Sequence, residues 1–118
     1  MAMNREQRAM QLWSVMVLAA SHHQILTYDL VAKACGLIRP SLGEFLKVVQ
    51  QYCLQQNLPP LTSIVVSEES GMPGPGCTVT AADLPRAQMR VFEHKWLDMK
   101  APNEKDLAEA CGRVPDAR

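Results

Sequence analysis

The chain has 118 residues, 47% of them hydrophobic, which favours one domain with a single modest core. Its 12 basic and 12 acidic side chains cancel, which argues against a protein built mainly to neutralise polyanions. The four cysteines include no C-x-x-C pair, so the sequence predicts neither a zinc ribbon nor a redox motif, and we expect scattered buried thiols. The apolar stretches are too short to span a bilayer and no signal peptide is recognisable, so we expect a cytoplasmic protein without membrane contact.

The first predicted helix spans residues 5–20. Asn4 and Gln7 have the spacing of a capping box at its start. Apolar residues then recur at steps of three and four, as a helix with one buried face requires: Leu12, Trp13, Met16, Val17 and Ala20.

A second, shorter helix is predicted to end at Cys35. Thr27 is placed to cap it, and Gly36 can adopt the left-handed turn that ends it. We expect three of its apolar residues to face inward: Leu30, Val31 and Ala34.

The third predicted helix spans residues 41–56 and follows a short turn that contains Gly36. Ser41 and Glu44 have capping-box spacing, and the apolar residues that follow lie on one face of a helix. Two helices joined by such a turn suggest a helix-turn-helix.

Strands are expected after the adjacent prolines Pro59 and Pro60, which forbid further helix. Residues 61–67, LTSIVVS, are rich in β-branched side chains, and a second short strand fits residues 77–81, CTVTA. The intervening EESGMPGPG holds too many Gly and Pro residues for a regular element and indicates the tip of a hairpin. The fold class predicted is therefore α+β, a winged helix-turn-helix with three N-terminal helices and a β-hairpin wing.

One or two C-terminal helices complete this prediction. Asp83 is placed to cap the first, in which Pro85 is tolerated in the first turn, and its apolar contacts are expected from Met89, Val91, Phe92 and Trp96. Residues 103–112 could form a short second helix. The division expected is a winged-helix domain over residues 1–100 and a short helix with a flexible tail over residues 101–118.

Residues 24–78 carry a Thr-Tyr helix start, a Gly-containing third helix, Pro-Pro-Leu-Thr, a Val-Val strand and a Gly-rich wing. In this order the segment resembles a group of small, mostly uncharacterised bacterial winged-helix proteins. More distantly it is similar to the DNA-binding domain of alkylguanine DNA alkyltransferases and to alkyltransferase-like proteins.

The chain departs from the alkyltransferase pattern at the residues that carry out alkyl transfer in that family. When Val65 and Val66 are set on the family's Val-Val, the family's Cys, His and Arg fall on Thr62, Ser63 and Ile64. Without a thiolate and its base, alkyl transfer has no acceptor. The Arg that enters the DNA stack in that family falls on Pro40, with Arg39 one residue earlier, so we do not expect base flipping.

A DNA-binding patch is predicted at the start of the third helix. Arg39, Ser41 and Lys47 surround free backbone N–H groups there, Lys33 extends the patch, and each contact to phosphate would be sequence-independent. Solvated charges at a helix start are also ordinary. Glu68 and Glu69 in the expected wing would be repelled by DNA, so the wing is not expected to lie against it.

Other sites are less well supported by the residues. The wing's G-M-P-G-P-G lacks the context of a phosphate-binding loop, and His22 and His23 indicate polar surface. A ligand or partner pocket would be indicated if Tyr28, Pro60 and Ser63 lined it together.

The function predicted is non-enzymatic DNA binding through the third helix, with no metal or cofactor. We expect the protein to act as a homodimer or within a regulatory, repair or defence assembly. A protein-interaction adaptor with an acidic wing is the alternative, and a sensor of a modified base or nucleotide is a third. Fold alone does not choose between them.

Overall fold

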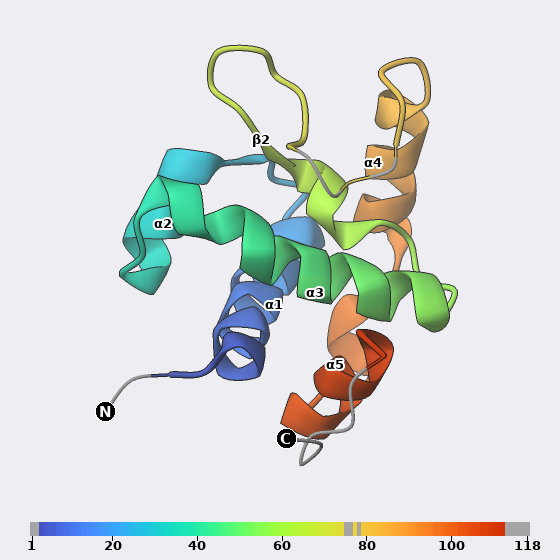
Figure 1. Ribbon diagram of the computed structural model, residues 1–118. Coiled ribbons are helices and arrows are strands. Elements are labelled where there is room, and N and C mark those ends of the chain that lie inside the picture. Colours follow the sequence, from blue (N-terminus) through green and yellow to red (C-terminus); the bar gives the residue numbers. More distant parts are fainter. Residues whose placement is uncertain (1–2, 75–76, 78, 113–118) are drawn as a thin grey trace.

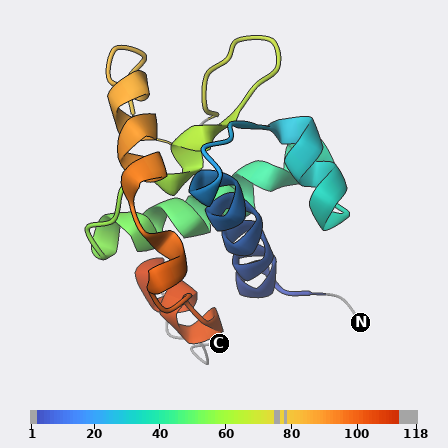
Figure 2. The same cartoon turned by 180° about the vertical axis from the view of Figure 1, so that it is seen from behind.

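The computed structural model describes residues 3–74, 77 and 79–112. Helices dominate it, and Figure 1 shows α3 crossing the front of the molecule with α1 behind it and α4 and α5 at one side. Seen from behind, α1 lies between α2 and the C-terminal helices (Figure 2). The helices are α1 (Arg5–Ser21), α2 (Tyr28–Cys35), α3 (Leu42–Gln55), α4 (Leu84–Glu93) and α5 (Glu104–Ala110).

Helix α1 is the central element of the core. Its capping box is confirmed, because the Asn4 side chain accepts the Gln7 backbone N–H at 2.8 Å and the Gln7 side chain accepts the Asn4 N–H at 3.0 Å. Leu12 and Met16 are fully buried, and the helix packs against α2, α3, α4 and α5. The periodic apolar residues of the sequence therefore mark its inner face correctly.

Helix α2 begins and ends as its sequence predicts. The Thr27 hydroxyl accepts the Leu30 N–H at 3.2 Å, and Gly36 has a φ of 67°, in the left-handed region. The predicted inward face is only partly correct: Val31 is fully buried, whereas Leu30 is 53% exposed and Ala34 is also exposed.

The capping box predicted at the start of α3 is wrong. A 3₁₀ turn, Arg39–Ser41, precedes the helix, and Ser41 itself has helical backbone angles. Its hydroxyl donates to the Ile38 carbonyl oxygen at 2.8 Å and so does not cap the N–H groups of α3. The chain therefore enters α3 through a continuous helical turn that includes Pro40.

The predicted β-hairpin wing is also wrong. Strand β2 (Val65–Val66) pairs in parallel with β1 (Leu26–Thr27), and none of the described residues of CTVTA, whose Thr78 lies outside the described part, is in a strand. Leu61–Ile64 form a 3₁₀ turn. The reason is burial: residues 61–66 are all buried, so this segment has no alternating exposed face for a wing.

The segment after β2 closes on itself as a loop. The Ser67 N–H donates to the Met72 carbonyl, the Gly71 N–H donates to the Ser67 carbonyl, and a single antiparallel bridge joins Val66 to Pro73. The Gly and Pro residues here make a turn of the main chain that needs no second strand.

The C-terminal helices pack back on the core, as expected. Asp83 has helical backbone angles and does not cap α4; its carboxylate instead accepts the Thr80 hydroxyl at 3.1 Å. Trp96 lies beyond the end of α4, is 2% exposed, and packs edge-to-face on Trp13. Helix α5 has a capping box and packs on α1 and α3, and the tail that follows, residues 113–118, lies outside the described part.

Candidate functional site

One face of α3 is open to solvent. Glu44, Lys47, Gln51 and Leu54 are exposed and lie at helical spacing, while Leu46, Val49 and Cys53 pack inward against the core. Lys33 on α2 is exposed as well, and neither lysine makes an ion pair with any residue in the described part. The surface of α3 therefore offers one cation and one carboxylate, with neutral groups beyond them.

Arg39 is held by acidic groups. Its guanidinium lies 3.7 Å from a carboxylate oxygen of Asp29 on α2 and 3.7 Å from one of Glu68 on the loop after β2. The same group lies 5.5 Å from the centre of the Tyr28 ring and 3.5 Å from the Ser67 hydroxyl. We refer to Tyr28, Asp29, Arg39, Ser67 and Glu68 as the Arg39 cluster.

The pKa values of the two carboxyl groups in the Arg39 cluster are shifted in opposite directions. A hydrogen bond with Glu68 raises the pKa of Asp29, and the nearby positive charge of Arg39 opposes that rise. The pKa of Glu68 is lowered, first by a hydrogen bond from its own backbone N–H and then by Asp29. Asp29 is therefore the partner that takes up the proton first as the pH falls.

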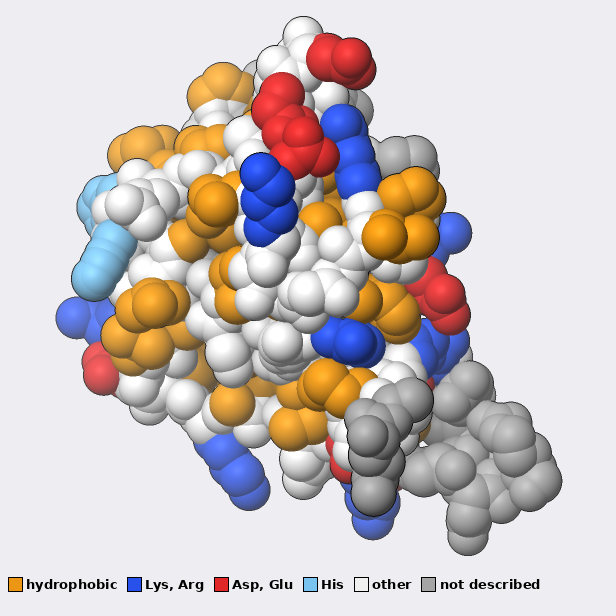
Figure 3. Space-filling view, turned by 90° about the vertical axis from the view of Figure 1, so that its left-hand side faces the viewer, with side chains coloured by type: hydrophobic (Ala, Val, Ile, Leu, Met, Phe, Trp, Pro, Cys, Tyr) orange, Lys and Arg blue, Asp and Glu red, His pale blue; other side chains and the backbone are white. Residues whose placement is uncertain are grey.

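Tyr28 connects this cluster to the Gly/Pro segment. Burial raises the pKa of its phenol, while a hydrogen bond from the Gly74 backbone opposes the rise. The main chain passes so close that a Cβ atom on Gly74 would lie 2.8 Å from the Tyr28 Cζ atom and would overlap its hydroxyl. Figure 3 shows acidic side chains gathered at the upper end of the face that includes α2, while the Lys and Arg side chains there stand singly.

The structure does not bring Tyr28, Pro60 and Ser63 together. Tyr28 belongs to the Arg39 cluster, and Ser63 is fully buried with a hydroxyl that has no hydrogen-bond partner among the described residues. Pro60 lines a pocket without Tyr28 or Ser63. This pocket lies between the C-terminal half of α3 and α4.

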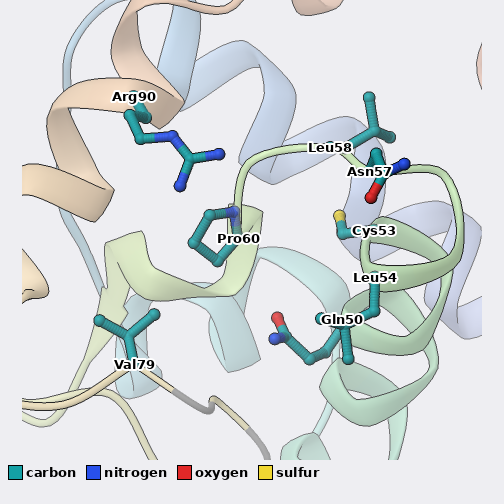
Figure 4. A pocket seen from close by; sticks show the side chains of 8 residues that line it. All are labelled: Gln50, Cys53, Leu54, Asn57, Leu58, Pro60, Val79 and Arg90. Atoms are coloured by element: carbon teal, nitrogen blue, oxygen red, sulfur yellow. The ribbon is translucent and has the colours of Figure 1, made fainter.

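Two adjacent cavities, of about 310 and 370 Å³, share Pro60, Val79 and Arg90, and we refer to them together as the α3–α4 groove. In Figure 4, Arg90 extends from α4 toward Pro60, and the Gln50 amide extends from α3 toward the side where Pro60 and Val79 lie. The first cavity is also lined by Cys53, Leu54, Asn57 and Leu58, and the second by Thr80, Asp83, Arg86 and Ala87.

A buried polar pair supports the floor of this groove. Gln50, 2% exposed, accepts the Thr62 hydroxyl at 2.7 Å through its side-chain oxygen. The Gln88 amide donates to the Ser63 carbonyl oxygen at 2.9 Å and so ties α4 to the same 3₁₀ turn. These contacts fix the distance between α3 and α4 at the groove.

The remaining candidate groups form no reactive cluster. Cys35 and Cys53 are buried and Cys77 and Cys111 partly exposed, all as free thiols. Within residues 3–74, 77 and 79–112, no three His, Cys, Asp or Glu side chains converge as metal ligands. His22 and His23 are exposed, and the ring of His23 stacks on Phe92 with the ring centres 5.2 Å apart.

Comparisons of the chain with protein-family models, curated proteins and solved structures found no match. No helix in the described part combines the length and the apolar content needed to cross a membrane.

Proposed function

We propose that this protein is a non-enzymatic DNA-binding module that contacts duplex phosphates from the open face of α3 and from α2. The supporting observation is the exposure of Lys47 on that face and of Lys33 on the preceding helix, neither of which makes an ion pair within the described part. Lys33 is close enough to Asp29 to lower the pKa of that carboxyl group, so Lys47 is the less opposed of the two cations. A helix packed on the core along one side and free along the other can approach a groove of DNA. Arg39 is not counted among the phosphate contacts, because Asp29 and Glu68 already neutralise it.

Such a module would bind weakly and with strong dependence on salt. Each phosphate contact made by a lysine adds about 0.9 to the slope of log affinity against log salt concentration. With two lysines on a chain of zero net charge, specific affinity would need a second copy or a partner.

The first prediction concerns these two lysines. Random-sequence duplex DNA is titrated by fluorescence anisotropy at several salt concentrations, with the wild-type chain and with Lys33→Ala/Lys47→Ala. We expect the double variant to bind more weakly at every sequence and its salt slope to fall by about 2.

The matched control is Lys105→Ala, which removes an exposed cation on α5, outside the two helices proposed to contact DNA. It should leave the slope unchanged. Absence of binding at low salt, or a double variant that behaves like the wild type, would contradict the proposal.

A protein-interaction adaptor is the second candidate, and the Arg39 cluster favours it. Next to Arg39, Ile38 is 71% exposed, and Leu30 on α2 is 53% exposed, so apolar side chains stand beside a neutralised cation and two carboxyl groups. Such a mixture suits a protein surface better than a phosphate backbone. The DNA titration separates the candidates, since the adaptor has no reason to bind DNA at low salt.

A further inference from the structure

The α3–α4 groove carries cationic groups that the fold does not use. Arg86 and Arg90 stand four residues apart on α4, so their side chains share one face of the helix, and both line the groove. Neither guanidinium makes an ion pair or a hydrogen bond with another residue of the described part. The carboxylate that lines the groove, Asp83, lies in the second cavity, where it accepts the Thr80 hydroxyl.

A side-chain amide from α3 faces the same space. The Gln50 side chain uses its oxygen to accept the Thr62 hydroxyl, whereas its Nε2 amide group has no hydrogen-bond partner among the described residues. The residue is 2% exposed, lines the first cavity, and points its amide toward Pro60 and Val79 (Figure 4). Because the residue lines the cavity, this amide can donate to water or to a ligand that accepts from it.

Apolar side chains also line the first cavity. They are Leu58, Pro60 and Val79, and Asn57 adds a second amide. The two cavities have the volumes typical of small-molecule sites, roughly 300 Å³ and above. Guanidinium groups match phosphate oxygens, side-chain amides match the edges of bases, and flat apolar surface matches a base or sugar.

We propose that the α3–α4 groove binds a nucleotide, free or within a single strand, with its phosphate at Arg90 and Arg86 and its base toward Gln50 and Pro60. Arg90 lines both cavities, so a phosphate beside it leaves the first cavity for the base, while the carboxylate of Asp83 in the second cavity opposes part of the attraction from Arg86. This site is separate from Lys33 and Lys47, so the inference does not depend on the proposed duplex-binding function.

The full chain is titrated with adenosine monophosphate, adenosine, inorganic phosphate and a single-stranded oligodeoxyadenylate. Isothermal titration calorimetry gives the affinities, and ¹H–¹⁵N NMR follows the Gln50 side-chain amide. We expect adenosine monophosphate to bind more tightly than either fragment and to shift the Gln50 resonance. Tighter binding of the oligonucleotide with the same shift would identify a strand as the source of the nucleotide.

Arg90→Ala should weaken nucleotide binding at least tenfold, and Arg90→Lys less, because lysine keeps the charge and loses the planar fork. The matched control, Lys95→Ala, removes an exposed cation just beyond α4 and should bind as the wild type does. The inference is overturned if adenosine monophosphate and the oligonucleotide fail to bind at millimolar concentration. It is equally overturned if they bind with no Gln50 shift, or with an affinity that Arg90→Ala leaves unchanged.

Discussion

Arg39 shows how the surroundings of one residue change its chemistry. By position it stands at the entrance to α3, where a cation would face phosphate. In the folded chain its guanidinium is shared between carboxylates from α2 and from the loop after β2, and it lies over the Tyr28 ring. Sequence neighbours could not reveal this, because Glu68 is 29 positions away and is brought close only when the chain folds.

Glycines at two positions are expected to respond oppositely to the same substitution. At Gly74, an alanine methyl would overlap the Tyr28 hydroxyl, so Gly74→Ala should destabilise the protein by roughly 1–3 kcal/mol through overpacking. At Gly43, on α3, a Cβ meets nothing within 4 Å, so Gly43→Ala should stabilise by up to about 1 kcal/mol.

Urea denaturation of both variants measures the two free energies of unfolding. Equal effects, or a Gly74→Ala protein as stable as the wild type, would show that the contact between the main chain and Tyr28 does not constrain the loop.

At the scale of single residues, predictions succeed where the interaction is local. Asn4 and Thr27 cap α1 and α2 as their spacing indicates, since the groups involved lie three positions apart. Ser41 and Asp83 have suitable identities, but the chain before each already follows helical turns, so their side chains bond elsewhere. The sequence does not predict the α3–α4 groove. The four-residue spacing of Arg86 and Arg90 indicates a cationic face on one helix, but the other side of the groove comes from α3, which is distant in the chain.

Among the elements, the least predictable was the segment after α3. Its β-branched run indicated a strand, yet only Val65 and Val66 are in one, because six consecutive residues are buried on all sides. A partner strand from before α2 completes the pair, and nothing in the local pattern points to it. The helices were predictable because their apolar periodicity reports one buried face each.

Helix α5 is expected to depend on its packing. With seven residues it is too short to be stable alone, and Leu107 is its fully buried anchor against α1 and α3. Leu107→Ala should lower the free energy of unfolding by about 2–5 kcal/mol. The α5 variant Glu109→Ala, at an exposed position, should change it by less than about 0.5 kcal/mol.

Chemical denaturation followed by tryptophan fluorescence measures both, since Trp13 and Trp96 lie in the core. A Leu107→Ala protein with wild-type stability would show that α5 is not part of the cooperative unit.

For the whole molecule, the thiols report how tightly the core is closed. Cys53 is 1% exposed, and burial raises its pKa to about 11, against an opposing hydrogen bond from the Leu61 backbone. At pH 8 only about one thousandth of this group would be thiolate. Its reaction with Ellman's reagent should therefore require opening of the core, whereas the partly exposed Cys111 should react promptly.

Mass spectrometry of timed samples assigns the modified cysteines, and labelling in concentrated urea, where all four should react at similar rates, is the control. Rapid labelling of Cys53 in the native protein would mean that the packing between α3 and the 3₁₀ turn Leu61–Ile64 opens readily.

Thr27 has two duties at once: it pairs with Val66 in the small sheet, and its hydroxyl caps α2. Val66 leads directly into the loop that carries Glu68. A molecule that displaced this loop would therefore also displace Val66 and, through the pairing with Thr27, the first turn of α2. The two-stranded sheet thus couples the position of the acidic loop to that of the helix preceding α3.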